Sequence, residues 1–228
     1  MLKLVRVRLN QFFETWKSEG FSSVRKKAFF FNKTVIPAVK DLSRLAAVKV
    51  SDKTSDVAFV EILDEHFAEK DFKFPTKSRA MRVGKNLKKG YRGFAVVRGD
   101  EVLGDMWYCT GGGPDAMRRH PDLEWFAWFG VTLGDKDVCM FEMYVKPQER
   151  GGGLVNLLHG NALKALKDKG FERVYGYCTI DNLPALWVHR IMGYKELGRL
   201  KMHRLGSVTR RSLKGDRRRV LYRFLDLS

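Results

Sequence analysis

The amino-acid sequence predicts a mixed α/β fold, and three observations lead to that prediction. Helical apolar spacings alternate with short β-rich runs from about residue 45 onward. Residues 94–109 form two apolar runs around a turn, the pattern of a β-hairpin. An apolar run over 138–145 leads through three consecutive glycines into a helical pattern. The 228 residues, 44% of them hydrophobic, are enough for one domain with a sizeable core.

Positive charge is concentrated at the two ends of the chain. There are 43 Lys and Arg residues against 26 Asp and Glu residues, a net charge of +17. Residues 1–45 hold ten basic and three acidic side chains, and residues 195–228 hold eleven and three. This field favours a polyanionic partner, such as a nucleotide cofactor, an anionic lipid or a phosphorylated substrate, and solubility alone is the alternative. No RNA-binding or helix-turn-helix signature is present, so we do not expect a nucleic-acid partner.

Residues 1–45 are expected to form a basic, amphipathic helical extension that precedes a domain over 46–228. The segment 22–33 repeats the basic and apolar character of the residues before it. Such helices lie on a membrane surface or dock on their own domain, and residues 1–33 are the predicted place of a peripheral membrane contact. Apolar residues recur at spacings of three and four at Leu2, Val5, Leu9, Phe12, Phe13 and Trp16.

Cysteine usage and the lack of long apolar runs indicate the compartment. No run approaches the roughly 20 apolar residues of a membrane-spanning helix, and the N-terminus has no signal-peptide apolar region. Cys109, Cys139 and Cys178 each lie in an apolar run, with neither disulfide nor metal-ligand spacing. We expect a reduced, cytoplasmic protein without a bound metal, with contact to the inner face of the membrane as an addition.

The expected elements follow one another along the chain. Residues 56–69 are ambiguous between strand and helix, and 110–136 are a loop-rich insertion dense in aromatic residues. Residues 78–90 are helical, with Ser78 as N-cap and Gly90 as the stop. The later elements are a strand over 138–145, a helix over 151–169 that buries Leu154, Leu158, Ala162 and Ala165, a strand over 173–179, a helix over 183–192, and strands near 194–205 and 219–227.

Glycines at a helix start suit the binding of an anion. A helix N-terminus exposes unpaired N–H groups and a partial positive charge, and glycines let an anion approach them because no Cβ intervenes. The triphosphate P-loop pattern is not matched, and Asn156 stands where the dinucleotide fingerprint needs glycine. The pattern that fits is Q/R-x-x-G-x-G/A, at Gln148, Gly151 and Gly153.

This pattern resembles the acetyl-CoA loop of the GNAT acetyltransferase superfamily. Downstream, the segment "DNLPALWVHRIMGYKELG" is similar to the superfamily's second signature, in which an Asn begins a short helix that ends in Gly-Phe or Gly-Tyr. The likeness is close over 138–198 and extends back to about residue 78. It implies an N-acetyltransferase that moves an acetyl group directly from acetyl-CoA to a primary amine. The matching residues are Asn182, Ala185, His189, Gly193 and Tyr194.

The resemblance also implies a fold and a coenzyme site. The sheet would have six to seven strands with helices on both faces, and the parallel strands 138–145 and 173–179 would splay apart to admit coenzyme A. Its pyrophosphate would lie on backbone N–H groups of the glycine turn, and its pantetheine arm along the first of these strands. The implied coenzyme-binding residues are Met143, Tyr144, Val145, Gln148, Glu149, Arg150, Gly151, Gly152, Gly153, Leu154, Asn182 and His189.

Three residues are candidates for proton transfer. His189 stands where many relatives have a tyrosine acid; histidine keeps the ability to move a proton, and a structural role is equally open. Glu142 is either the base or neutralised by an arginine, because a buried carboxylate is costly. Asp137, eleven residues before Gln148, matches the glutamate base of histone-type relatives or is an ordinary turn residue. A water-relayed proton exit needs neither carboxylate, and Asp181 is expected to cap the following helix.

The acceptor amine is less defined by the sequence. By resemblance its pocket is built from 60–92 and 110–136, and the aromatic residues there and nearby form either its walls or the core. Basic residues near the C-terminus suggest an anionic amine, such as an amino sugar or sugar nucleotide of surface-polysaccharide synthesis. A peptide or protein amine, or an inactive GNAT-fold protein that binds anionic partners, are the alternatives. We expect a monomer or a homodimer. The residues concerned are Trp107, Tyr108, His120, Asp122, Glu124, Trp125, Phe126, Trp128, Phe129, Arg210, Arg211, Lys214, Arg217, Arg218 and Arg219.

Overall fold

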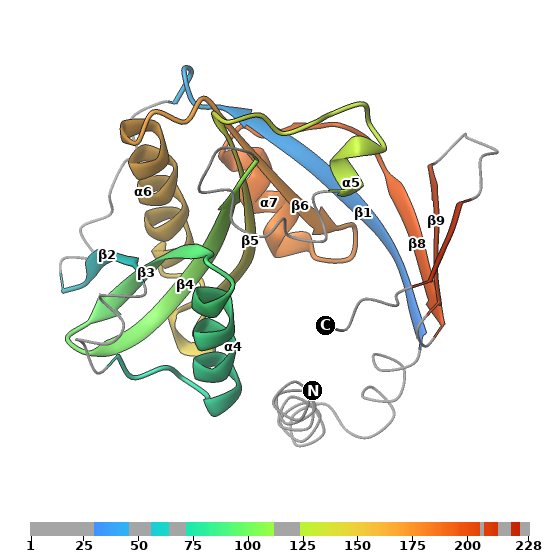
Figure 1. The fold of residues 1–228 in the computed structure, drawn as a ribbon. Helices are drawn as coiled ribbons and strands as arrows, with labels where there is room; N and C mark the ends of the chain where they lie inside the picture. Colours follow the sequence, from blue (N-terminus) through green and yellow to red (C-terminus); the bar gives the residue numbers. More distant parts are fainter. Residues whose placement is uncertain are drawn as a thin grey trace.

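A computed structural model describes residues 30–45, 56–63, 72–111, 124–205, 208–213 and 220–223. Strands and helices alternate along these residues, so the predicted mixed α/β class is confirmed (Figure 1). The elements are β1 (Phe30–Asp41), β2 (Ala58–Ile62), α4 (Lys77–Lys88), β3 (Arg92–Arg98), β4 (Glu101–Thr110), α5 (Glu124–Ala127), β5 (Asp137–Val145), the 3-10 turn η3 (Pro147–Glu149), α6 (Leu154–Asp168), β6 (Arg173–Thr179), α7 (Leu183–Ile191), β7 (Lys195–Glu196), β8 (Leu200–Leu205), β9 (Val208–Leu213) and β10 (Val220–Arg223).

The strands form one sheet in the order β10-β9-β8-β1-β6-β5-β4-β3-β2, with β7 paired to β1. Within the described ranges this sheet has ten strands rather than the predicted six to seven. The difference arises at one side, where β8, β9 and β10 extend the sheet beyond β1 by antiparallel pairing. Among the described strands, every pairing is antiparallel except that between β5 and β6, which is parallel.

Residues 30–41 correct the prediction of a helical extension. They form β1, which lies between β6 and β8 (Figure 1). Val35, Ile36 and Ala38 of this strand are buried. The β-branched run Thr34–Ile36 fits a pleated, buried surface, which explains why a strand forms here. The remaining part of the predicted extension, residues 1–29, and its predicted membrane contact lie outside the described residues.

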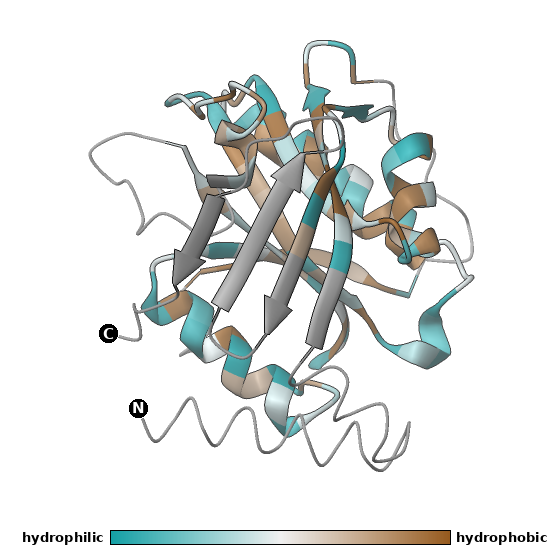
Figure 2. Ribbon diagram, turned by 90° about the vertical axis from the view of Figure 1, so that its right-hand side faces the viewer, coloured by the Kyte–Doolittle hydropathy of each residue, from teal (hydrophilic) through white to brown (hydrophobic). Residues whose placement is uncertain are grey.

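The two faces of the sheet carry two hydrophobic cores. One core packs Leu158, Leu163 and Leu166 of α6 against the sheet, and the other packs Val83 and Leu87 of α4 on the opposite side. Helices therefore cover both faces, as predicted. In Figure 2 the helices carry both hydrophilic and hydrophobic residues, as expected for elements that contact the sheet on one side and solvent on the other. None of the described helices is long and apolar enough to cross a membrane.

Helix α4 begins one residue before the predicted N-cap. Thr76, not Ser78, caps the helix, because the Thr76 side chain accepts the backbone N–H of Arg79 at 3.1 Å. Ser78 lies in the first turn instead. Gly90 follows the helix with a positive φ of 75°, which confirms its role as the stop. The hairpin of β3 and β4 is confirmed as well.

Candidate active site

Strands β5 and β6 separate and leave a cavity between them. They pair only at three positions, from Asp137 opposite Arg173 to Cys139 opposite Tyr175, and then diverge. A cavity of about 660 Å³ lies where they have separated, and the β5 residues from Met140 to Val145 line it. This arrangement confirms the predicted splay of the two central parallel strands.

The glycine turn stands at one end of this cavity. After β5, the N–H groups of Glu149 and Arg150 donate to the carbonyls of Lys146 and Pro147 at 2.9 and 3.3 Å. Gly151 and Gly153 then adopt left-handed conformations with φ of 85° and 87°, and α6 begins at Leu154 instead of residue 151. The first N–H groups of a helix have no partner within it. The turn therefore presents backbone donors next to the cavity.

The structure places seven of the predicted coenzyme residues in the cavity lining, namely Met143, Tyr144, Val145, Arg150, Gly151, Asn182 and His189. The other five, Gln148, Glu149, Gly152, Gly153 and Leu154, form the turn and helix start beside it. One backbone group of this strand edge already has a partner. The Arg150 Nε donates to the Val145 carbonyl at 3.1 Å.

Asn182 is the N-cap of α7. Its Oδ1 accepts the backbone N–H of Ala185 at 3.3 Å, while its side chain also lines the cavity. The prediction that Asp181 caps this helix is wrong. Asp181 instead forms an ion pair with Lys33 at 3.0 Å, which ties the start of α7 to β1.

His189 lies on the face of α7 turned to the cavity. Its ring stacks on Tyr194 with centroids 4.7 Å apart and planes 17° apart. Burial lowers the pKa of His189 to about 4, so the imidazole is neutral at pH 7. Its Nδ1 is buried and has no hydrogen-bond partner among the described residues. The ring therefore borders the cavity as a neutral imidazole whose Nδ1 is enclosed by the protein.

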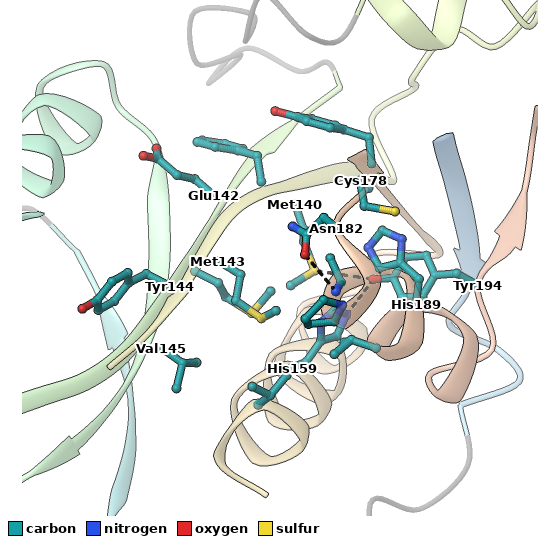
Figure 3. Close-up of a pocket in the computed structure, with 18 of the residues that line it drawn as sticks. Met140, Glu142, Met143, Tyr144, Val145, His159, Cys178, Asn182, His189 and Tyr194 are labelled. Atoms are coloured by element: carbon teal, nitrogen blue, oxygen red, sulfur yellow. Dashed lines mark hydrogen bonds between the residues drawn. The ribbon is translucent and has the colours of Figure 1, made fainter. Parts of the chain in front are cut away.

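His159 of α6 also lines the cavity, and the sequence analysis did not find it. Its Nε2 lies 2.9 Å from the Tyr194 hydroxyl, and its ring meets His189 edge-on with centroids 6.4 Å apart (Figure 3). Burial, and then the charge of His189, lower the pKa of His159 to about 3. Burial also raises the pKa of Tyr194. The available signal was a histidine on the apolar face of a helix, next to Leu158 and Ala162.

Glu142 lines the cavity, and its carboxylate contacts α4. It accepts hydrogen bonds from Arg82, from Arg79 Nη1 at 3.4 Å and from Asn86 Nδ2 at 3.3 Å. Figure 3 shows the carboxylate directed away from His159, His189 and Tyr194. The neutralising arginine foreseen as an alternative for Glu142 is therefore present.

Asp137 lies at the other end of β5, where the two strands are still paired. Its fully buried carboxylate accepts from Arg173 Nε at 2.7 Å and Nη2 at 3.0 Å, and from the Gly134 N–H at 2.8 Å. It does not line the cavity. These bonds fix the strand entry.

The aromatic candidates for an acceptor pocket are mainly core residues. Trp107, Tyr108, Trp125 and Phe126 are buried, and Trp128 and Phe129 pack against the cluster that contains Trp125. His120 and Asp122, the side chain of Glu124, and the basic side chains near the C-terminus lie outside what the structure describes. Over the described ranges, no three His, Cys, Asp or Glu side chains are grouped so that they could hold a metal ion.

Three solved structures are among those similar to this chain. A tandem GNAT protein from the clavulanic acid biosynthesis pathway is 14% identical with a TM-score of 0.50, over 85% of this chain and 58% of that chain. A functionally unknown conserved protein from Staphylococcus epidermidis is 12% identical with a TM-score of 0.48, over 80% of this chain and 66% of that chain. A fungal glucosamine N-acetyltransferase region within a multi-domain β-N-acetylglucosaminidase is 19% identical with a TM-score of 0.48, over 83% and 23%.

The family is shown by a match to the sequence itself. The chain matches less than two thirds of the length of each of these three proteins. A search of curated proteins gives no significant match. The family model described as the acetyltransferase (GNAT) family, however, matches residues 59–194, more than half of the chain, and this range includes β5, the glycine turn, α6 and α7. The chain therefore belongs to the GNAT acetyltransferase family.

Proposed function

We propose that this chain transfers the acetyl group of acetyl-CoA directly to a primary amine. One observation carries the proposal: two parallel strands diverge around a cavity that ends at a glycine turn and a helix N-terminus. A strand edge suits an amide-containing arm, and a helix N-terminus suits a diphosphate. Both parts of the coenzyme would then be recognised by backbone groups.

The residues of the cavity fit this coenzyme. A Cβ placed on Gly151 would have no atom within 4 Å, so the turn is open to a bulky anion. Met143 and Tyr144 would offer strand backbone to the pantetheine arm, and the Asn182 side chain lies on the facing wall. When bound, the coenzyme supplies an activated acetyl thioester, whose carbonyl carbon is attacked by a neutral amine while the C–S bond breaks.

His189 is the proposed donor to the departing sulfur. The residue lines the cavity and its ring is neutral at pH 7, so the ring would donate a hydrogen bond to the sulfur and would not act as a charged acid. Tyr194 holds the ring in place by stacking. Glu142 and Asp137 stay predictions as bases; Asp137 is outside the cavity lining, and proton exit through water needs neither.

For the acceptor, we propose an anionic amine, with an amino sugar or sugar nucleotide as the first class to test. The support is the net charge of +17 and its concentration at both ends of the chain. The test is coenzyme-dependent thiol release with a panel of amino sugars, sugar nucleotides, polyamines, amino acids and peptides. Release with peptides alone would favour the peptide acceptor, and no coenzyme binding by calorimetry would reject the proposed function.

Replacing His189 with phenylalanine should lower kcat by about 10- to 100-fold, because the ring keeps its shape and stacking but loses its donor. The coenzyme Kd should stay within about threefold, since the diphosphate contacts are elsewhere. His189→Tyr, which restores a donor of the kind found in many relatives, is the matched control and should recover part of kcat. If His189→Phe turned over at the wild-type rate, His189 would not be the donor and its role would be structural.

A further inference from the structure

Glu142 has an unusual backbone conformation for a residue with a side chain. Its φ is 58°, the only positive φ at a non-glycine position among the described residues. It lies in a β-bulge: Asp105 pairs with Tyr144 and Trp107 with Phe141, so Glu142 and Met143 together face the single residue Met106. A left-handed residue with a Cβ is strained, so surrounding contacts must hold it there.

The backbone of the bulge is held by a buried ion pair. Arg79 Nη2 donates to the Glu142 carbonyl at 3.1 Å. The same guanidinium is fixed by Asp105, through Nε to Oδ2 at 2.9 Å and through a second bond from Nη2. Asp105 is fully buried and also accepts the Trp107 Nε1–H at 2.8 Å. Three elements, α4, β4 and β5, therefore meet at this carbonyl.

The side chain of Glu142 is held by the same helix. Both carboxylate oxygens already accept hydrogen bonds, one from Arg82 and Arg79 and the other from Asn86. A carboxylate oxygen can accept more than one bond, so these contacts hold the side chain in place without by themselves excluding proton transfer. Here the carboxylate is directed toward α4 and away from the rings of the cavity (Figure 3).

We infer that Glu142 is a positioning residue that acts through its left-handed backbone, which Arg79 and Asp105 hold so that it forms the bulge in β5. The bulge sets the direction of Met143 and Tyr144, the segment on which the proposed function places the coenzyme arm, so the inference rests on that function. The bulge lies in the part of β5 that is no longer paired with β6. The role of Glu142 is conformational. The effects expected of substitutions at this position therefore differ from those expected for a base.

Three substitutions at position 142 separate the two roles. Glu142→Gly accepts the left-handed conformation freely and should retain at least about a third of the wild-type kcat. Glu142→Val, whose β-branched side chain excludes that conformation, should lose at least tenfold in kcat and weaken coenzyme binding. Glu142→Gln, nearly isosteric, should lie between them. For a base, all three should lose about 10²- to 10⁴-fold alike, and that result would overturn the inference.

Hydrogen exchange of the β5 amides gives a readout that does not need activity. Exchange at Met143 and Tyr144 should rise at least tenfold in Glu142→Val and stay near wild type in Glu142→Gly. Arg82→Met, which removes one bond to the carboxylate but leaves the Arg79–Asp105 pair, should change it little. Equal exchange in the Val and Gly variants would overturn the inference. If the wild type releases no thiol, the proposed function fails. The exchange comparison would still test the inference about Glu142, because it does not depend on activity.

Discussion

Gly151→Asp abolishes measurable coenzyme A binding while the protein remains folded. The new carboxylate would stand beside the backbone donors of the turn and repel the diphosphate. At about 5 Å and an effective dielectric constant of about 20, one such pair of charges costs about 3 kcal/mol, or more than 100-fold in Kd. Folding should survive, because a Cβ at this position meets no atom within 4 Å. Calorimetry with coenzyme A measures the loss.

Gly151→Asn is the control for strain. Gly151 has a φ of 85°, and Asn and Asp tolerate the left-handed region about equally, so the pair differs mainly in charge. The Gly151→Asn variant should bind coenzyme A with a Kd no more than about tenfold above that of the wild type. Pantetheine, which lacks the diphosphate, should bind both variants alike. A Gly151→Asp protein that binds coenzyme A with wild-type affinity would contradict the assignment of the turn as the diphosphate site.

The turn could be predicted because its chemistry is local. Three glycines between an apolar run and a helical pattern specify a strand, a turn and a helix without any distant contact. The same holds for the hairpin of β3 and β4, whose turn residues lie between two apolar runs. The helix boundary at Leu154 was missed by three residues because Gly151 and Gly153 take left-handed conformations, which the residue types permit but do not require.

Distant contacts account for what the sequence did not reveal. β1 was taken for part of a helical extension because residues 22–33 repeat the basic and apolar character of the residues before them, whereas pairing with β6 and β8 decides its conformation. The bulge at Glu142 depends on Arg79 and Asp105, which are remote in the sequence. His159 became a site residue only because α6 lies beside α7 and Tyr194 at the cavity.

Acidification from pH 6.5 to 5 should lower the free energy of unfolding by several kcal/mol. Burial holds the pKa of His159 at about 3 and that of His189 at about 4, both below the 6.5 of an exposed histidine. The native state keeps both rings neutral, and the unfolded chain protonates them below pH 6.5. This stability is therefore complete above pH 6.5 and is lost toward pH 4. Each histidine contributes up to about 1.4 kcal/mol per pH unit, which urea unfolding at several pH values measures.

The double variant His159→Gln/His189→Gln tests whether these two rings cause the slope. Glutamine does not titrate and can still form a hydrogen bond with the Tyr194 hydroxyl, so the variant should flatten the pH dependence between 5 and 6.5. Each single variant should remove about half of the slope. Carboxylates in the unfolded chain titrate mainly below pH 5, which separates them from the histidines. An unchanged slope in the double variant would mean that the acid sensitivity arises elsewhere, and that the two imidazoles are less buried than the contacts of α6 and α7 require.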